Sequence, residues 1–325
     1  MLRLVPRLQV ISVRCLSSGA QTAAASSAKK DALMKLRKKT GYSYVNVRKA
    51  VEQFGPDKLE EAEKWLRDLA KKEGWAKAAK LGTRVTSQGM IGAQAKDNRA
   101  AVVELNCETD FVSSCDVFKE LLEEVTTAAL EASKNLSAPS DKVLHSQNID
   151  LESVQTSKNR PVKEAIAMTV GKLGENITIA KAQVYVAPVK VPVFVQCHPR
   201  NGTSITEMGR YASILGIART QTSSSFPTQK LAAQICQHII GMKPVTLGSP
   251  VQATKQEIKK EVDGEKDELN EFYSGEVTQM DEDETQLLRQ SFMLNPSQTV
   301  HDYLGSHGAE IISFARMELG VKDDN

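Results

Sequence analysis

Long apolar runs and paired cysteines are both missing from this 325-residue chain. A membrane-spanning helix needs about 18 consecutive apolar residues, and no stretch approaches that length, so we expect no membrane interaction. The five cysteines are an odd number and none of them form C-x-x-C. The sequence therefore favours neither a disulfide framework nor a zinc site. The apolar fraction of 41% and the charged fraction of 25% are ordinary for globular domains.

Signatures of catalysis are absent as well. The chain has no G-x-x-x-x-G-K-[ST] loop, because Gly171-Lys172 lacks the upstream glycine of that motif. Neither H-E-x-x-H nor G-x-S-x-G occurs. The five histidines are scattered, and His301 and His307 do not share a helix face. The sequence thus predicts a protein that acts by binding and is not an enzyme, with no cofactor and no metal.

Acidic residues are missing from residues 1–28, which hold Arg3, Arg7, Arg14 and several serines. A basic, serine-rich and acid-free start is typical of a mitochondrial presequence, so we expect import into the mitochondrial matrix. A merely disordered N-terminus is the alternative. Loss of these three arginines would change the formal net charge from +2 to −1. Either net charge is too close to zero for a protein whose main function is to bind a nucleic acid backbone.

Residues 29–75 are predicted to form a module of three short helices. The middle helix has apolar residues at the i, i+3, i+4, i+7 spacing, namely Val47, Ala50, Val51 and Phe54. The helices on either side carry apolar stripes that comprise Leu33 and Leu36 in the first, and Leu59, Ala62, Leu66 and Leu69 in the third. Gly74 is expected to close the third helix, and residues 75–81 to form a basic connector.

The remainder predicts an α+β core built from two copies of one unit, in which two strands precede a helix. The first copy has strands at 85–94 and 101–107 and a helix over 118–129; the second has strands at 191–197 and 209–218 and a helix over 231–242. Further elements are expected at 165–170 (helix), 300–304 (helix) and 309–319 (strand). We assign the copies to subdomains 83–185 and 186–325, the latter with a charged insert at 252–289.

The segment from Asn106 to Val112 lies where a strand of the first copy ends and a loop leads into the helix. Such a loop presents side chains outward from a rigid base, so Asp110 followed by Phe111 could probe the pocket of a partner. The alternative is structural, with Asp110 as a loop or capping residue and Phe111 in the core. Taken alone, the residues favour the structural interpretation.

The run N-C-E-T-D-F-V at 106–112 closely resembles the signature of the elongation factor Ts family. Other segments agree in order: L-R-K-K-T-G at 36–41, K-L-G-E-N-I at 172–177 and S-F-A-R-M-E at 313–318. The resemblance implies a three-helix module of ubiquitin-associated type, followed by a core of two related βα subdomains. Bacterial relatives carry a long coiled-coil insertion where this chain has room only for a short charged insert. That difference, with the presequence, points to the mitochondrial branch.

The resemblance also implies guanine-nucleotide exchange on mitochondrial elongation factor Tu, a GTPase, with release of GDP and reloading with GTP. The exchange probe would be the segment of Thr109, Asp110, Phe111 and Val112, here called the tip. The second copy has no counterpart of it. Other implied contacts are Arg37, Tyr44, Val45, Leu173, Gly174 and Glu175, of which Tyr44 and Val45 replace methionines of bacterial relatives.

Two other classes of function stay open on the residues alone. One is an adaptor that binds ubiquitin or peptides through the three-helix module, which would leave the α+β core unexplained. The other is an RNA-binding translation factor that uses the small basic patch at 71–80, where Trp75 is the one aromatic residue available for stacking.

Overall fold

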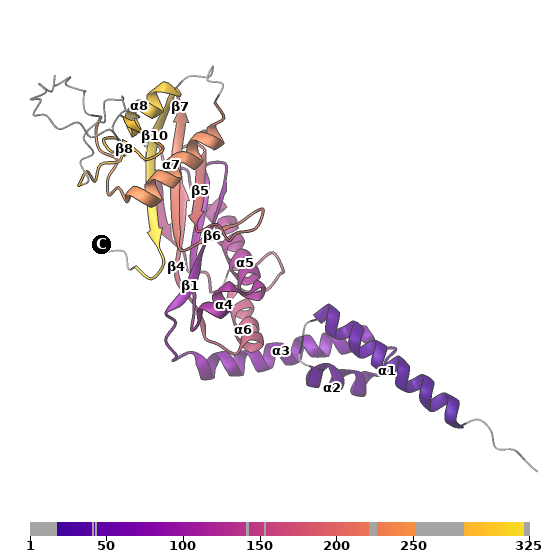
Figure 1. Ribbon diagram of the computed structural model, residues 1–325. Coiled ribbons are helices and arrows are strands. Elements are labelled where there is room, and N and C mark those ends of the chain that lie inside the picture. The colour runs from indigo at the N-terminus through magenta and orange to yellow at the C-terminus, as the bar shows by residue number, and fades with distance from the viewer. Residues whose placement is uncertain are drawn as a thin grey trace, which may run out of the picture. The chain divides into compact units, whose positions relative to one another are not determined.

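The computed structural model describes residues 18–40, 42, 44–140, 143–152, 154–220, 226–250 and 283–321. These residues divide into two compact units, of which the first ends at Glu73 and the second begins at Gly74. Figure 1 shows the order of the elements along the chain. The predicted presequence lies outside the described residues up to residue 17, and the predicted charged insert does so over residues 252–282.

Three helices form the N-terminal unit, as the sequence predicts. Helix α1 spans Ser18–Thr40 and so begins inside the predicted presequence; α2 spans Tyr44–Phe54, and α3 begins at Leu59. The core of the unit contains most of the apolar residues that the helical spacing singled out, and Leu33, Phe54 and Leu59 pack partly against it. Its buried members are Ala32, Leu36, Val47, Ala50, Val51, Ala62 and Leu66.

Helix α3 is longer than the sequence predicts, because it spans Leu59–Leu81. The prediction that Gly74 closes this helix is wrong, and residues 75–81 are helical instead of a connector. The reason is tertiary: a Cβ atom at Gly74 would lie 2.6 Å from the backbone oxygen of Ala167. Glycine here allows close approach to the backbone of helix α6 (Val162–Leu173); it does not end the helix.

The first sheet of the second unit has five antiparallel strands in the order β3-β4-β2-β1-β6. The strands are β1 (Gln88–Lys96), β2 (Arg99–Cys107), β3 (His145–Asn148), β4 (Ile177–Val186) and β6 (Glu207–Gly209). Its helical segments are α4 (Asp110–Ser114), α5 (Asp116–Ala132), the 3₁₀ turn η1 (Ser133–Asn135) and α6. The predicted β1, β2 and α5 are confirmed, whereas β3, β4 and β6 were missed.

The second sheet has the antiparallel order β10-β7-β5. Its strands are β5 (Val193–His198), β7 (Tyr211–Arg219) and β10 (Ala309–Glu318). This part of the chain also contains the helices α7 (Thr228–Met242) and α8 (Val300–Ser306) and a separate two-stranded sheet of β8 (Ser291–Phe292) and β9 (Asn295–Thr299). Helix α7 lies across β5 and β7 (Figure 1). The predicted repeat is confirmed, because β1, β2 and α5 in the first copy correspond to β5, β7 and α7 in the second.

The two sheets pack against each other and leave their outer faces to the helices. Along β2, alternate residues point to opposite faces: Val103 and Leu105 pack toward α5, whereas Val102 packs toward the second sheet. Ile214 on β7 belongs to the same buried cluster as Val102. Strand β2 is therefore buried on both faces, which makes its C-terminal end at Cys107 a firm base for the segment that begins at Glu108.

A buried ion pair ties α5 to the segment before α6. The Glu124 side chain is only 3% exposed and accepts hydrogen bonds from Arg160 at 2.8 and 2.6 Å and from Lys158 at 2.9 Å. Burial alone would raise the pKa of Glu124, but the hydrogen bonds from Arg160 and Lys158 lower it to about 2. The pair holds α5 against the chain that leads into α6 and β4.

Candidate functional site

The segment after β2 forms a short capped helix that carries an exposed phenylalanine. Helix α4 begins at Asp110, and its N-cap Thr109 has extended dihedral angles of φ −125° and ψ 156°. The Thr109 hydroxyl accepts a hydrogen bond from the backbone N–H of Val112 at 3.4 Å, which is the usual N-cap geometry. Phe111 is 84% exposed. The structural interpretation, with Phe111 in the core, is therefore wrong for the free chain.

The helical turn of α4 explains why Phe111 points outward. Successive residues of an α-helix are rotated by about 100°, so Phe111 and Ser113 lie on nearly opposite faces. Ser113 is buried, and its hydroxyl donates to the backbone oxygen of Asp110 at 2.9 Å. Val112 packs partly against the core that includes α5. The capping residue is Thr109, so the interpretation of Asp110 as a cap is also corrected.

A glutamate from a distant part of the chain anchors Thr109. Glu175 lies between α6 and β4, and its carboxylate accepts two hydrogen bonds from Thr109, one from the backbone N–H at 3.0 Å and one from the hydroxyl at 2.7 Å. The Cys107 thiol donates to the backbone oxygen of Thr109 at 3.1 Å. Burial raises the pKa of this thiol to about 12, so it stays protonated and serves as a donor.

A second set of contacts crosses between the same two segments. The backbone N–H of Asn176 donates to Glu108 at 2.7 Å, and the Asn176 side-chain amide donates to the backbone oxygen of Arg84 at 2.8 Å. The Arg84 guanidinium in turn lies 3.3 Å from the Glu108 carboxylate. Two consecutive residues before the tip helix, Glu108 and Thr109, are thus bonded to two consecutive residues of the turn after α6, Glu175 and Asn176.

The structure brings seven of the ten sequence-predicted site residues together. Thr109, Asp110, Phe111 and Val112 form the tip, and Leu173, Gly174 and Glu175 form the turn beside it. Leu173 packs partly against the core, whereas Gly174 ends α6 in the left-handed conformation, with φ 79° and its N–H bonded to the Val170 oxygen at 2.8 Å. That left-handed residue turns the chain so that Glu175 faces Thr109.

The other three predicted residues lie in the N-terminal unit. Arg37 is exposed near the end of α1, and Tyr44 and Val45 are 52% and 61% exposed at the start of α2. Exposed apolar groups of this size are available for contact with another protein. Sequence reasoning missed Arg84 and the anchoring contacts of Glu108 and Asn176, although the last two stand inside the quoted motifs and flank the residues chosen.

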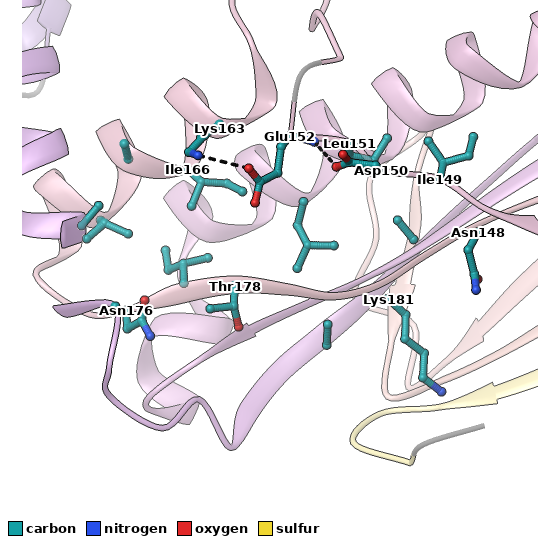
Figure 2. A pocket seen from close by; sticks show the side chains of 18 of the residues that line it. Asn148, Ile149, Asp150, Leu151, Glu152, Lys163, Ile166, Asn176, Thr178 and Lys181 are labelled. Atoms are coloured by element: carbon teal, nitrogen blue, oxygen red, sulfur yellow. Dashed lines mark hydrogen bonds and ion pairs between the residues drawn. The ribbon is translucent and has the colours of Figure 1, made fainter. Parts of the chain in front are cut away.

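A groove of about 710 Å³ lies beside the turn, between α6, β4 and the C-terminal part of α3. Figure 2 shows its lining, including the ion pair of Lys163 with Glu152 at 3.1 Å and the side chains of Asn176 and Thr178 near one end. None of the ten predicted site residues lines this groove. The groove therefore neighbours the anchor of the tip and does not include the tip.

The tip presents an apolar ring and a carboxylate, which suits contact with a protein. In the described part of the chain, no three His, Cys, Asp or Glu side chains gather in a way that could hold a metal ion. None of the described helices combines the length and hydrophobicity needed to cross a membrane.

Comparison with known proteins gives the family. Residues 108–321 match the family model for elongation factor TS, and residues 13–76 match that for the N-terminal part of mitochondrial elongation factor Ts. Mitochondrial elongation factor Ts of Brugia malayi is 52% identical over 295 residues, which cover 90% of this chain and 88% of that protein. The Caenorhabditis elegans protein of the same name is 46% identical, with 95% and 97% covered, and the Bos taurus protein is 33% identical, with 94% and 84% covered.

These matches cover the tip, the turn after α6 and the three-helix unit, and they agree with the observed architecture. The mitochondrial relatives and the mitochondrial N-terminal model place the chain in the mitochondrial matrix. The chain therefore belongs to the elongation factor Ts family, in its mitochondrial branch, whose members act as guanine-nucleotide exchange factors for elongation factor Tu.

Proposed function

We propose that the chain releases GDP from mitochondrial elongation factor Tu by inserting the tip of residues 109–112 into the GTPase domain beside its magnesium site. The observation that carries this proposal is an 84% exposed Phe111 on a short helix that is anchored at Thr109. Transfer of such a ring from water into a protein pocket is favourable by about 1.5–3 kcal/mol. The anchored base means that the ring is presented without further ordering.

The two residues of the tip that point outward have different roles. Phe111 would act as the wedge between partner side chains, and the Asp110 carboxylate would bring negative charge close to the ion and the phosphate loop. Arg37, Tyr44 and Val45 would provide a second contact with the same GTPase domain from the N-terminal unit. The turn of Leu173, Gly174 and Glu175 would border the tip.

The exchange mechanism needs coupled binding and no covalent step. If the factor weakens the affinity of the GTPase for GDP by some ratio, GDP weakens the affinity for the factor by the same ratio. Hydrogen bonds to charged groups are worth about 1.5–3 kcal/mol each, and each tenfold in affinity corresponds to about 1.4 kcal/mol. Disturbing the ion and one or two phosphate contacts would thus weaken GDP binding by several powers of ten.

The deciding experiment is release of labelled GDP from mitochondrial elongation factor Tu, with and without this protein in substoichiometric amount. We expect each molecule of the protein to release many molecules of GDP, because the factor is regenerated when GTP rebinds. Release that is no faster than the spontaneous rate, by a protein that is shown to be folded, would refute the proposal. RNA binding with a steep salt dependence would then favour the RNA-binding alternative.

A further inference from the structure

We infer that Glu175 is a positioning residue for exchange: it acts through Thr109 on the placement of Phe111, and its carboxylate does not need to touch the partner. The inference rests on the proposed role of the tip. It differs from the contact role that the family resemblance implies for Glu175.

The Glu175 carboxylate binds the first residue of the tip with both of its oxygens. Both of its oxygens accept hydrogen bonds from the same residue, since Oε1 lies 2.7 Å from the Thr109 hydroxyl and Oε2 lies 3.0 Å from the Thr109 backbone nitrogen. Two bonds to two atoms of one residue fix its orientation as well as its position. Thr109 is the residue from which α4 starts, so its orientation sets the direction in which Phe111 points.

The Thr109 hydroxyl links Glu175 to the first turn of α4. A hydroxyl has one donor and two acceptor sites; here the proton goes to Glu175 and a lone pair receives the N–H of Val112 at 3.4 Å. The carboxylate thus orients the hydroxyl for capping. This matters because α4 has only five residues, far fewer than the roughly 12–15 that a helix needs to be stable alone. Its order must come from contacts such as these.

The test introduces Glu175→Ala into the unchanged protein and into variants of Phe111 and Thr109. The measured quantity is the rate of GDP release from mitochondrial elongation factor Tu, at saturating and subsaturating concentrations of each variant. In the otherwise unchanged protein we expect the maximal rate to fall about tenfold, the order expected for loss of a hydrogen bond to a charged group. The concentration for half-maximal release should change much less. Thr109→Val should produce a similar loss, and Thr109→Ser, which keeps the hydroxyl, should restore most of the exchange rate that Thr109→Val loses.

The deciding measurements use variants that already lack the Phe111 ring or the Thr109 hydroxyl. If Glu175 acts through Phe111, Glu175→Ala should cause no further loss in Phe111→Ala. It should cause a smaller loss in Phe111→Leu, the milder change, than in the otherwise unchanged protein, because the leucine retains part of the activity that depends on placement. It should also cause little further loss in Thr109→Val. A direct contact with the partner, or a loss of folded protein, would instead lower the rate by the same factor in every background.

Two outcomes would overturn the inference. One is an undiminished effect of Glu175→Ala in the Phe111→Leu and Thr109→Val backgrounds, and the other is the lack of any effect in the unchanged protein. Failure of the proposed function is separate, because it would appear as normal exchange by Phe111→Ala itself. Melting temperatures of all variants, measured on the same preparations, correct the rates for folded fraction.

Discussion

Phe111→Ala is expected to reduce exchange strongly while leaving the free protein nearly as stable as before. The ring is 84% exposed, so nearly all of the burial gain of about 1.5–3 kcal/mol is realised only in the complex. At about 1.4 kcal/mol per tenfold, exchange efficiency should fall about ten- to a hundredfold. The free energy of unfolding should change by no more than about 0.5 kcal/mol, the range that is usual for surface substitutions.

The assay measures the thermal stability and the rate of labelled GDP release of each variant on the same preparation. Val189→Ala is a matched control, because this side chain is 70% exposed in the connection between β4 and β5 and lies outside the tip. We expect it to change neither quantity. Asp110→Ala separates charge from shape: Asp110 stands in the first turn of α4 but is not its cap, so the loss of stability should be about 0.3–1 kcal/mol.

Two results would contradict the reasoning. A fall in stability of about 3–5 kcal/mol is typical for truncation of a buried phenylalanine, and it would mean that Phe111 belongs to the core in solution. Normal exchange per folded molecule would mean that the exposed ring is not the wedge. Either result would refute the proposed role of the tip, provided that Val189→Ala changes neither the stability nor the exchange rate.

Three further predictions concern stability and processing. Glu124→Gln should lower the free energy of unfolding by about 3 kcal/mol at pH 7, because the folded pKa of Glu124, about 2, lies below the ordinary 4.5. In urea titrations, the difference in stability from the unchanged protein should shrink as the pH falls from about 4.5 to 2. A stability difference that does not depend on pH would contradict this prediction. Gly74→Ala should lower the free energy of unfolding by about 1–3 kcal/mol, since the new Cβ would lie 2.6 Å from the backbone of Ala167. The control is Gly305→Ala in α8, where a Cβ meets nothing within 4 Å; it should be neutral or stabilising by up to about 1 kcal/mol. Equal melting temperatures for the two variants would refute the packing argument. N-terminal sequencing of the matrix protein should find a start between Leu16 and Lys30, and a protein that still begins at Met1 would contradict the presequence.

Much of the candidate site could be predicted from the sequence, but the contacts within it could not. The motif at 106–112 marks the tip, and the motif at 172–177 marks the turn, yet the two stand far apart in the sequence and nothing in either shows that Glu175 bonds to Thr109. The residues alone favoured a buried Phe111. Its exposure depends on which face of α4 meets the core, and that face is chosen by the packing of Val112 and Ser113.

The sequence by itself determined the elements with strong periodicity and the lack of catalytic motifs. The stripes of α2 and α5 were predicted because burial of one face requires regular spacing. The strands β2 and β7 were predicted because burial of both faces requires a short, nearly continuous apolar run. The sequence did not indicate β3, whose four residues are all exposed, or the three-residue β6, which pairs with β1 of the other copy. Such pairing depends on long-range contacts and leaves no local pattern.

Tertiary structure also decided the position of Gly74 inside α3 and the contacts of Glu175. By local propensity a glycine should end α3, but the close approach of the Ala167 backbone requires a residue without a side chain in the middle of the helix. A glutamate in a turn should be a solvated surface residue, but the fold of α6 and β4 places it against Thr109. In both cases the physical reason is the same: the residue that each one contacts comes from a distant part of the chain, and only the folded chain brings the two together.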